Sequence, residues 1–145
     1  SYDNYFEELN EYKKKNKLDK VILLKNISYG LWFKLLKKAI AGFAFYEPIN
    51  TSHNLMGGTS QKLNNYIFAS IPSLVSKNKD FISFNNKYDT SLIVNNNSIK
   101  NIILKVNMIL NNKNLYNLKK KNNSIAFKKE FNFEKQISTI EKFFD

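Results

Sequence analysis

The sequence predicts an α/β domain: a parallel sheet with helices on both faces, ending in helices. Short apolar runs alternate with stretches whose apolar residues recur at helical spacing, which is the pattern of strands and helices in turn. The stretches between the runs are too long for two-residue hairpins, so the strands are expected to be parallel. After residue 94 every remaining apolar pattern is helical.

The first half of the chain contains two predicted helices and two predicted strands. An amphipathic helix opens the chain, and the continuous apolar run Val21–Leu24 predicts a strand buried on both faces. Helical spacing returns over 31–39, and the run 40–46 predicts the second strand. The stripe of the opening helix consists of Tyr2, Tyr5, Phe6, Leu9 and Tyr12.

The second half continues the alternation and then becomes helical. A helix is predicted over 63–69, a strand over 72–75, a short helical turn over 81–84 and a strand over 91–94. Ser98 is a suitable N-cap for the first of the closing helices. Their apolar stripes cover 99–110, 115–118 and 133–144. We therefore expect one domain over 1–145. Helices and strands alternate over 1–94, and the part over 95–145 is helical.

Length and composition narrow the class of protein. A chain of 145 residues with 43% hydrophobic residues is expected to be one globular domain. It has no apolar run of the roughly 20 residues that span a bilayer and no signal segment at its start, which predicts a cytoplasmic protein. Cysteine is absent and His53 is the one histidine, so no metal site is expected.

The net charge of +11 suggests an anionic partner, either nucleic acid or a membrane surface. Every basic residue is lysine, whereas bidentate recognition of guanine and phosphate favours arginine. This composition argues against nucleic acid. It leaves peripheral contact with anionic lipid on the cytoplasmic face open.

The stretch from Tyr46 to Val75 carries the candidate site. Gly57 and Gly58 end its loop, and paired glycines allow positive φ angles and the close approach of a ligand. Thr59 or Ser60 is a preferred N-cap for the next helix, whose start attracts phosphate. Lys62 lies in its first turn, where a cation is disfavoured unless an anion lies nearby. An ordinary capped loop with a surface lysine fits the same residues.

The loop from residue 47 to residue 59 follows the carboxyl end of a predicted strand, where open α/β sheets bind ligands. About a dozen residues is longer than most strand-to-helix connections, and this length indicates function. Its polar residues are Glu47, Asn50, Thr51, Ser52, His53, Asn54, Thr59 and Ser60.

The order of these motifs resembles the donor-binding region of group 1 glycosyltransferases of the two-domain GT-B architecture. The segments that carry the resemblance are GFAFYEP (42–48), SQKLNNY (60–66) and ASIPSLV (69–75), which are similar to the family pattern P-N-K-L-F-E-Y-x-x-A-G-x-P-V-V. In addition, 20–25 is similar to the V-x-F-L-G strand, 98–110 to the helix after the last strand and 131–144 to the closing F-x-W-E helix. The resemblance implies a partial Rossmann-like, carboxy-terminal donor domain that is truncated at its start.

The resemblance implies a nucleotide-diphosphate sugar as donor, with the diphosphate held at the glycine turn. The implied donor-binding residues are Glu47, Ser52, His53, Asn54, Gly57, Gly58, Thr59, Ser60, Lys62, Leu63 and Asn65. Asn65 replaces a glutamate that binds the ribose in the family, Ser70 replaces a preferred glycine, and Gly57 replaces an acid. No catalytic residue is assigned, because Gly57 stands at a position where many members carry a glutamate and because the acceptor domain and a basic segment of the family pattern have no counterpart here. No metal or cofactor is expected, because no Asp-rich motif stands beside the loop.

The sequence thus predicts the donor half of a hexosyl-type glycosyltransferase that acts on a glycan or lipid-linked acceptor. One alternative is a non-catalytic basic α/β module that binds RNA or an anionic surface, with affinity that falls steeply with salt. The other is a sugar-nucleotide epimerase with the same two-domain architecture.

Overall fold

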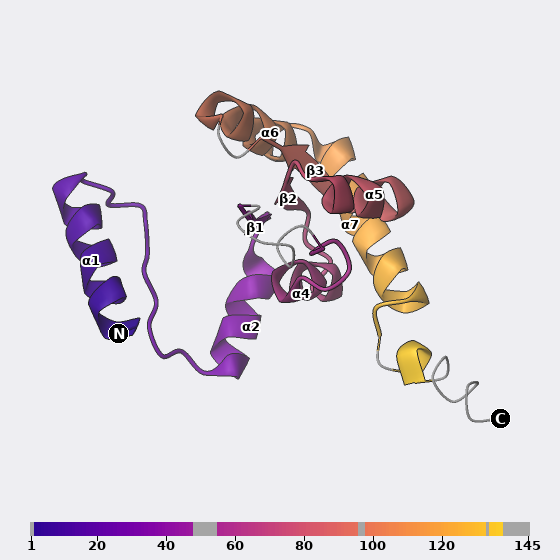
Figure 1. Ribbon diagram of the computed structural model, residues 1–145, viewed down its shortest axis with the longest axis horizontal. Helices are drawn as coiled ribbons and strands as arrows, with labels where there is room; N and C mark the ends of the chain where they lie inside the picture. Colours follow the sequence, from indigo (N-terminus) through magenta and orange to yellow (C-terminus); the bar gives the residue numbers. More distant parts are fainter. Residues whose placement is uncertain (1, 48–54, 96–97, 133, 138–145) are drawn as a thin grey trace. The chain divides into compact units, whose positions relative to one another are not determined.

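The computed structural model describes residues 2–47, 55–95, 98–132 and 134–137 (Figure 1). The chain divides into two compact units, Ser1–Leu35 and Leu36–Asp145. The prediction of a single domain over 1–145 stays a prediction. Among the described residues no helix is both long and apolar enough to cross a membrane.

The first unit contains α1 (Tyr2–Lys15) and the first turns of α2 (Tyr29–Lys38). The predicted opening helix is confirmed, and it ends in Lys13, Lys14 and Lys15, whose charges suit the negative end of the helix dipole. The ammonium of Lys25 lies 5.3 Å from the centre of the Phe6 ring. This cation–π contact links the extended segment after α1 back to the helix.

The predicted strand at Val21–Leu24 is wrong. These residues form no ladder, and the side chains of Val21, Ile22 and Leu24 are 42%, 77% and 50% exposed. A strand buried on both faces needs neighbouring strands and covering helices. The described part of this unit supplies neither, so four apolar residues in a row do not make a strand here.

The second unit is built on a parallel sheet of three strands in the order β1 (Gly42–Ala44), β2 (Ser73–Ser76) and β3 (Ser91–Val94). Phe43 aligns with Leu74, and Leu74 aligns with Leu92. Between the strands run α4 (Gln61–Phe68) and α5 (Lys79–Tyr88). The α/β class and the parallel sheet are confirmed, and the arrangement is consistent with part of a Rossmann-like fold.

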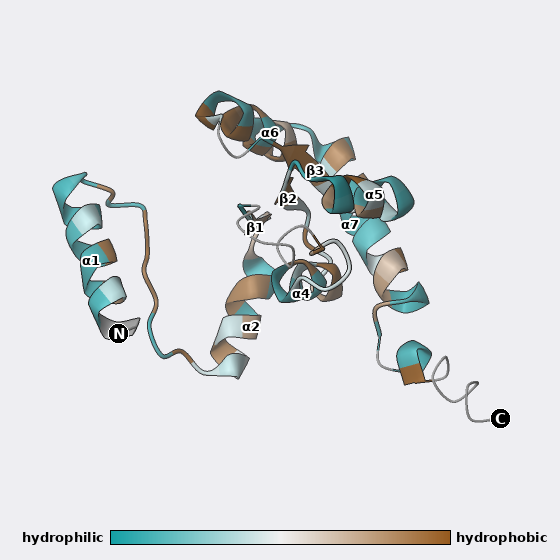
Figure 2. Cartoon of the chain, viewed as in Figure 1, coloured by the Kyte–Doolittle hydropathy of each residue, from teal (hydrophilic) through white to brown (hydrophobic). Residues whose placement is uncertain are grey.

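Each face of the sheet carries its own core. Ala44 and Val75 pack with Leu63 and Ile67 of α4 and Phe81 of α5 on one face. On the other face Leu74, Leu92 and Val94 pack with Ile109 of α6 (Ile99–Asn111). Figure 2 shows β3 and much of α6 as hydrophobic. The prediction of helices on both faces is therefore confirmed.

The helix α7 (Lys113–Lys129) contributes to both cores. Leu115 and Tyr116 pack against the cluster of Leu74 and Leu92, and Ala126 belongs to the opposite cluster. Its Asn123 is fully buried, and the side-chain NH2 donates to the carbonyl oxygens of Thr90 (3.0 Å) and Lys119 (2.8 Å). The predicted helical end of the chain is observed over α6 and α7, while residues 133 and 138–145 lie outside the described residues.

The segment 81–84 was predicted as a short helical turn and belongs to the longer helix α5. The side chain of Asn78 caps this helix by accepting from the N–H of Phe81 at 2.8 Å. Phe81, Phe84 and Tyr88 then repeat at helical spacing and all contact the core. The sequence signal for the longer helix was its N-cap residue, Asn78, which precedes the short apolar pattern over 81–84.

Gly42 is required by the packing of β1 against α4. A Cβ atom on Gly42 would overlap the Tyr66 ring, whose hydroxyl donates to the Phe43 carbonyl oxygen at 3.1 Å. We expect Gly42→Ala to lower the free energy of unfolding by about 1–2 kcal/mol, because the ring has to leave this hydrogen bond. Urea denaturation measures the change. The matched control is Gly30→Ala, where a Cβ meets nothing within 4 Å, and an equal loss in both variants would contradict the explanation.

Candidate ligand-binding edge of the sheet

Three helices begin at the carboxyl edge of the sheet, because α4, α5 and α6 follow β1, β2 and β3 in the chain. Their N-caps are Ser60, Asn78 and Ser98. Each cap accepts one backbone N–H, at 3.2 Å from Leu63, 2.8 Å from Phe81 and 3.3 Å from Asn101. The predicted caps at Ser60 and Ser98 are thus confirmed. Three positive helix ends therefore gather at the edge where α/β sheets bind ligands.

The glycine turn at this edge is shaped by a carboxylate of the protein itself. Neither Gly57 nor Gly58 has a positive φ angle, so the turn does not use the positive φ angles that glycine allows. Gly57 is buried, and its N–H donates to the Oδ2 atom of Asp80 at the start of α5. A Cβ on Gly57 would lie 2.8 Å from the Asp80 carbonyl oxygen. The close approach that requires this glycine is the approach of Asp80.

Beside this turn a tyrosine connects the start of α4 to α5. The Tyr46 hydroxyl lies 2.9 Å from the Ser60 Oγ atom, and its ring stacks on Phe81 with the ring centres 5.9 Å apart. The Lys62 ammonium lies 5.4 Å from the centre of the Tyr46 ring. An exposed ammonium above an aromatic ring is stabilised by the ring quadrupole. Lys62 therefore has a preferred position in the first turn even without a bound anion.

The other predicted donor-binding residues differ in how exposed they are. Thr59 is exposed, and its hydroxyl donates to the Leu55 carbonyl oxygen at 2.8 Å. Leu63 is fully buried in the core, so only its backbone lies near the edge. Glu47 and Gly58 are exposed, and Asn65 is half-buried in α4. The residues Ser52, His53 and Asn54 lie outside the described residues. The donor-binding role of all these residues stays a prediction.

Two cavities open near this edge. The first has a volume of about 470 Å³ and is lined by Leu55, Lys79, Asp80 and Ser83. It adjoins the glycine turn and contains both a cation and a carboxylate. The Asp80 carboxylate places negative charge in this cavity. The cavity therefore favours hydroxyl or amide groups of a ligand over phosphate.

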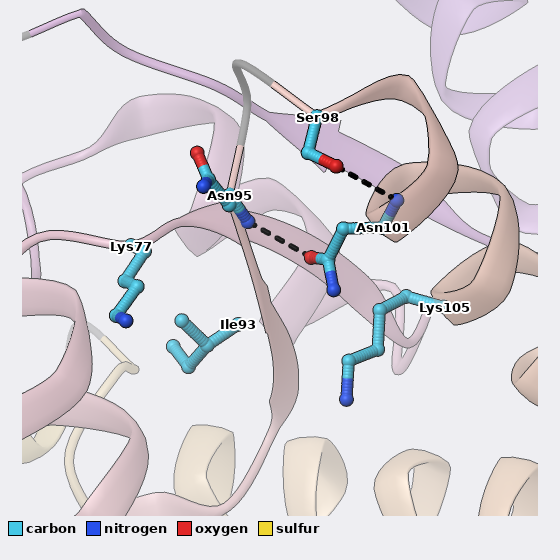
Figure 3. Close-up of a pocket in the computed structure, with 6 residues that line it drawn as sticks. All are labelled: Lys77, Ile93, Asn95, Ser98, Asn101 and Lys105. Carbon is cyan, nitrogen blue, oxygen red and sulfur yellow. Dashed lines mark hydrogen bonds between the residues drawn. The ribbon is translucent and has the colours of Figure 1, made fainter.

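The second cavity, also about 470 Å³, lies at the ends of β2 and β3 (Figure 3). In Figure 3 the side chain of Lys77 lies beside Ile93 on one side of β3, whereas the side chains of Asn101 and Lys105 lie on its other side. No carboxylate lines it, and neither lysine forms an ion pair within the described ranges. Its lining residues are Lys77, Ile93, Asn95, Ser98, Asn101 and Lys105.

The orientation of the Asn101 side chain is fixed by its neighbours. Its Oδ1 atom accepts the backbone N–H of Asn95 at 3.0 Å, which leaves the NH2 group toward the cavity. The N–H of Lys77 donates to the Val94 carbonyl oxygen at 2.7 Å and holds Lys77 at the end of β3. The sequence analysis missed these residues. The sequence signal for Lys77 and Asn95 was their position, since each comes directly after a strand.

The opposite, amino edge of β3 holds a polar cluster of mixed charge. The Tyr88 hydroxyl donates to Oε2 of Glu130, and the Lys87 ammonium lies 3.0 Å from the same oxygen. Burial, followed by the bond to Glu130, raises the pKa of Tyr88. In α4, burial also raises the pKa of Tyr66. Both tyrosines are therefore neutral proton donors near pH 7 and not bases.

Glu130 gives a pH-dependent prediction. The hydrogen bond from Tyr88, and then that from Lys87, lowers the pKa of Glu130 below its usual 4.5. A lowered folded-state pKa stabilises the fold above the usual value, and this contribution is lost as pH falls through the lowered one. We expect Glu130→Gln to flatten the acid decline of stability in urea denaturation at a series of pH values. Glu134→Gln, at another exposed glutamate, is the control, and an equal flattening there would contradict the assignment.

Within the described part of the chain, no three His, Cys, Asp or Glu residues cluster in a way that could hold a metal ion. No family model, no curated protein and no solved structure matches the chain.

Proposed function

We propose that this chain is the donor-binding part of a glycosyltransferase and that it binds a nucleotide-diphosphate sugar at the carboxyl edge of its sheet. The observation that carries the proposal is the gathering of three capped helix starts at that edge, next to a cavity lined by Lys77 and Lys105. Such an edge offers N–H donors and positive charge to a phosphorylated ligand. The order of motifs that resembles the GT-B donor region supports the sugar nucleotide as the ligand.

The chemistry expected of such a domain is electrostatic. The leaving nucleoside diphosphate gains negative charge as the glycosidic bond breaks, and preorganised positive groups stabilise that charge. We expect Lys62, Lys77 and Lys105 to supply positive charge of this kind at the described edge. We expect no metal in this part of the reaction. The acceptor, a glycan or a lipid-linked glycan, would bind outside the residues described here.

Calorimetric titration with uridine and guanosine diphosphates and their sugars tests the proposal. We expect saturable binding of one of these nucleotides with a single-site stoichiometry. The control ligand is adenosine monophosphate, which offers a base and one phosphate without a diphosphate. Binding that is equal for all nucleotides and vanishes at moderate salt would contradict the donor-binding function.

The second candidate is a basic module that binds RNA or an anionic surface, and the net charge of +11 favours it. It predicts affinity for any polyanion with a steep salt dependence. The complete absence of arginine counts against base-specific recognition. Titration of a single-stranded RNA and of a uridine diphosphate sugar at two salt concentrations separates the candidates.

Peripheral contact with an anionic membrane on the cytoplasmic face is an additional proposal within this function. Ile99, Ile103 and Leu110 of α6 are 74%, 54% and 54% exposed, and Lys100 and Lys113 are exposed near them in sequence. Apolar side chains flanked by lysines suit an acidic lipid surface. Sedimentation with vesicles that contain phosphatidylserine tests this contact, and no cosedimentation at low salt would refute it.

A further inference from the structure

We propose that Lys77, Asn101 and Lys105 form an anion site for a diphosphate group. The site lies at the ends of β2 and β3 and not at the glycine turn that the sequence indicated. The anion site is argued from its own geometry, while its assignment to a nucleotide rests on the proposed function.

The donors of the site come from two fixed elements. Lys77 follows β2, where its backbone N–H is bonded to the Val94 carbonyl oxygen at 2.7 Å. Asn101 and Lys105 lie one turn apart on α6, so their side chains share one side of that helix. Residues from the end of β2 and from α6 thus line a single cavity that runs past β3, with Lys77 on one side of the strand and Asn101 and Lys105 on the other (Figure 3).

The lysines of this cavity have no ion-pair partner among the described residues. Only uncharged residues line it besides the two lysines, and neither lysine is paired with a carboxylate in the described ranges. Two lysines that line one cavity without a carboxylate give it a positive potential, which attracts an anion. A diphosphate supplies enough negative charge and enough acceptor oxygens for both lysines and the Asn101 amide.

The glycine turn is less suited to a diphosphate. Its Gly57 N–H already donates to the Asp80 carboxylate, and a second anion beside this group would be repelled. The cavity of Lys77 and Lys105 contains no such group. Its volume of about 470 Å³ lies in the usual range for small-molecule sites, and Ile93 gives it an apolar wall.

Inorganic pyrophosphate is the probe that tests this site, by calorimetry with the full 145-residue chain. The test variant is Lys77→Gln/Lys105→Gln, and the matched control is Lys120→Gln/Lys121→Gln, which removes the same charge from exposed positions of α7. We expect the test variant to lose at least about tenfold in affinity, whereas the control stays within about twofold of the parent protein. Denaturation in urea establishes that both variants are folded.

A second variant changes the site without changing its shape. Asn101→Asp keeps an oxygen for the Asn95 N–H but replaces the donor toward the cavity with negative charge. We expect this variant to weaken pyrophosphate binding about tenfold or more. Asn107→Asp, at an exposed position of the same helix, is its control.

The outcomes are distinct. The inference is overturned if the parent protein does not bind pyrophosphate, or if the test and control variants lose affinity equally. Pyrophosphate binding that depends on Lys77 and Lys105 supports the site even where no sugar nucleotide binds, and only the proposed function then fails. Sugar-nucleotide binding that is unaffected by the test variant supports the proposed function and overturns this site.

Discussion

Asp89→Asn is expected to lower the free energy of unfolding by about 2–3 kcal/mol, because it leaves Lys119 without its counterion. The Lys119 side chain is only 6% exposed, and its ammonium is paired with the Asp89 Oδ1 atom. Breaking a buried ion pair on one side typically costs about 3–5 kcal/mol, and the 50% exposure of Asp89 places this variant below that range. Asparagine is the suitable replacement, since Asp89 has a φ of 50° and asparagine tolerates that conformation.

A second change distinguishes this explanation from a simple loss of contacts. Adding Lys119→Met to Asp89→Asn removes the uncompensated charge and keeps the apolar stem. We expect urea denaturation to show that the double variant recovers more than half of the lost stability. A double variant that is less stable than Asp89→Asn alone would contradict the role of Asp89 as counterion.

Gly57→Ala is expected to destabilise the protein by about 1–3 kcal/mol, because the new Cβ collides with a backbone atom that cannot rotate away. That atom is the Asp80 carbonyl oxygen, 2.8 Å from the Cβ position. The neighbouring Gly58 provides the control, since a Cβ there meets nothing within 4 Å. Urea denaturation of both variants measures the difference, and equal stabilities would show that the contact with Asp80 is not what requires a glycine.

The strands of the second unit could be predicted from sequence, but the interpretation of the first apolar run could not. Ser91–Val94 is a strand as predicted, because its residues pack into two cores at once. Val21–Leu24 has the same apolar pattern without a neighbouring strand among the described residues. The local sequence pattern indicates which side chains a segment can bury. Only the tertiary structure decides whether a neighbouring strand is present to pair with it.

The N-caps of the helices at the candidate site could be predicted from sequence, but the contacts between residues far apart in the chain could not. Ser60 and Ser98 act as caps through residues three positions away, which is a local signal. Asp80 meets Gly57 across 23 residues of sequence, a contact that depends on how α5 packs. The convergence of Lys77 and Lys105 likewise depends on where α6 lies, which sequence spacing does not determine.

An amide NMR spectrum recorded with and without uridine diphosphate tests the central claim most directly, since it shows which edge of the sheet meets the ligand. We expect the amides of Lys77, Asn95 and Asn101 to shift, because they border the cavity at the carboxyl edge. The amides of Tyr88 and Asn122, at the amino edge, should keep their positions. Shifts confined to the amino edge, or an unchanged spectrum at saturating ligand, would contradict a phosphate-binding carboxyl edge.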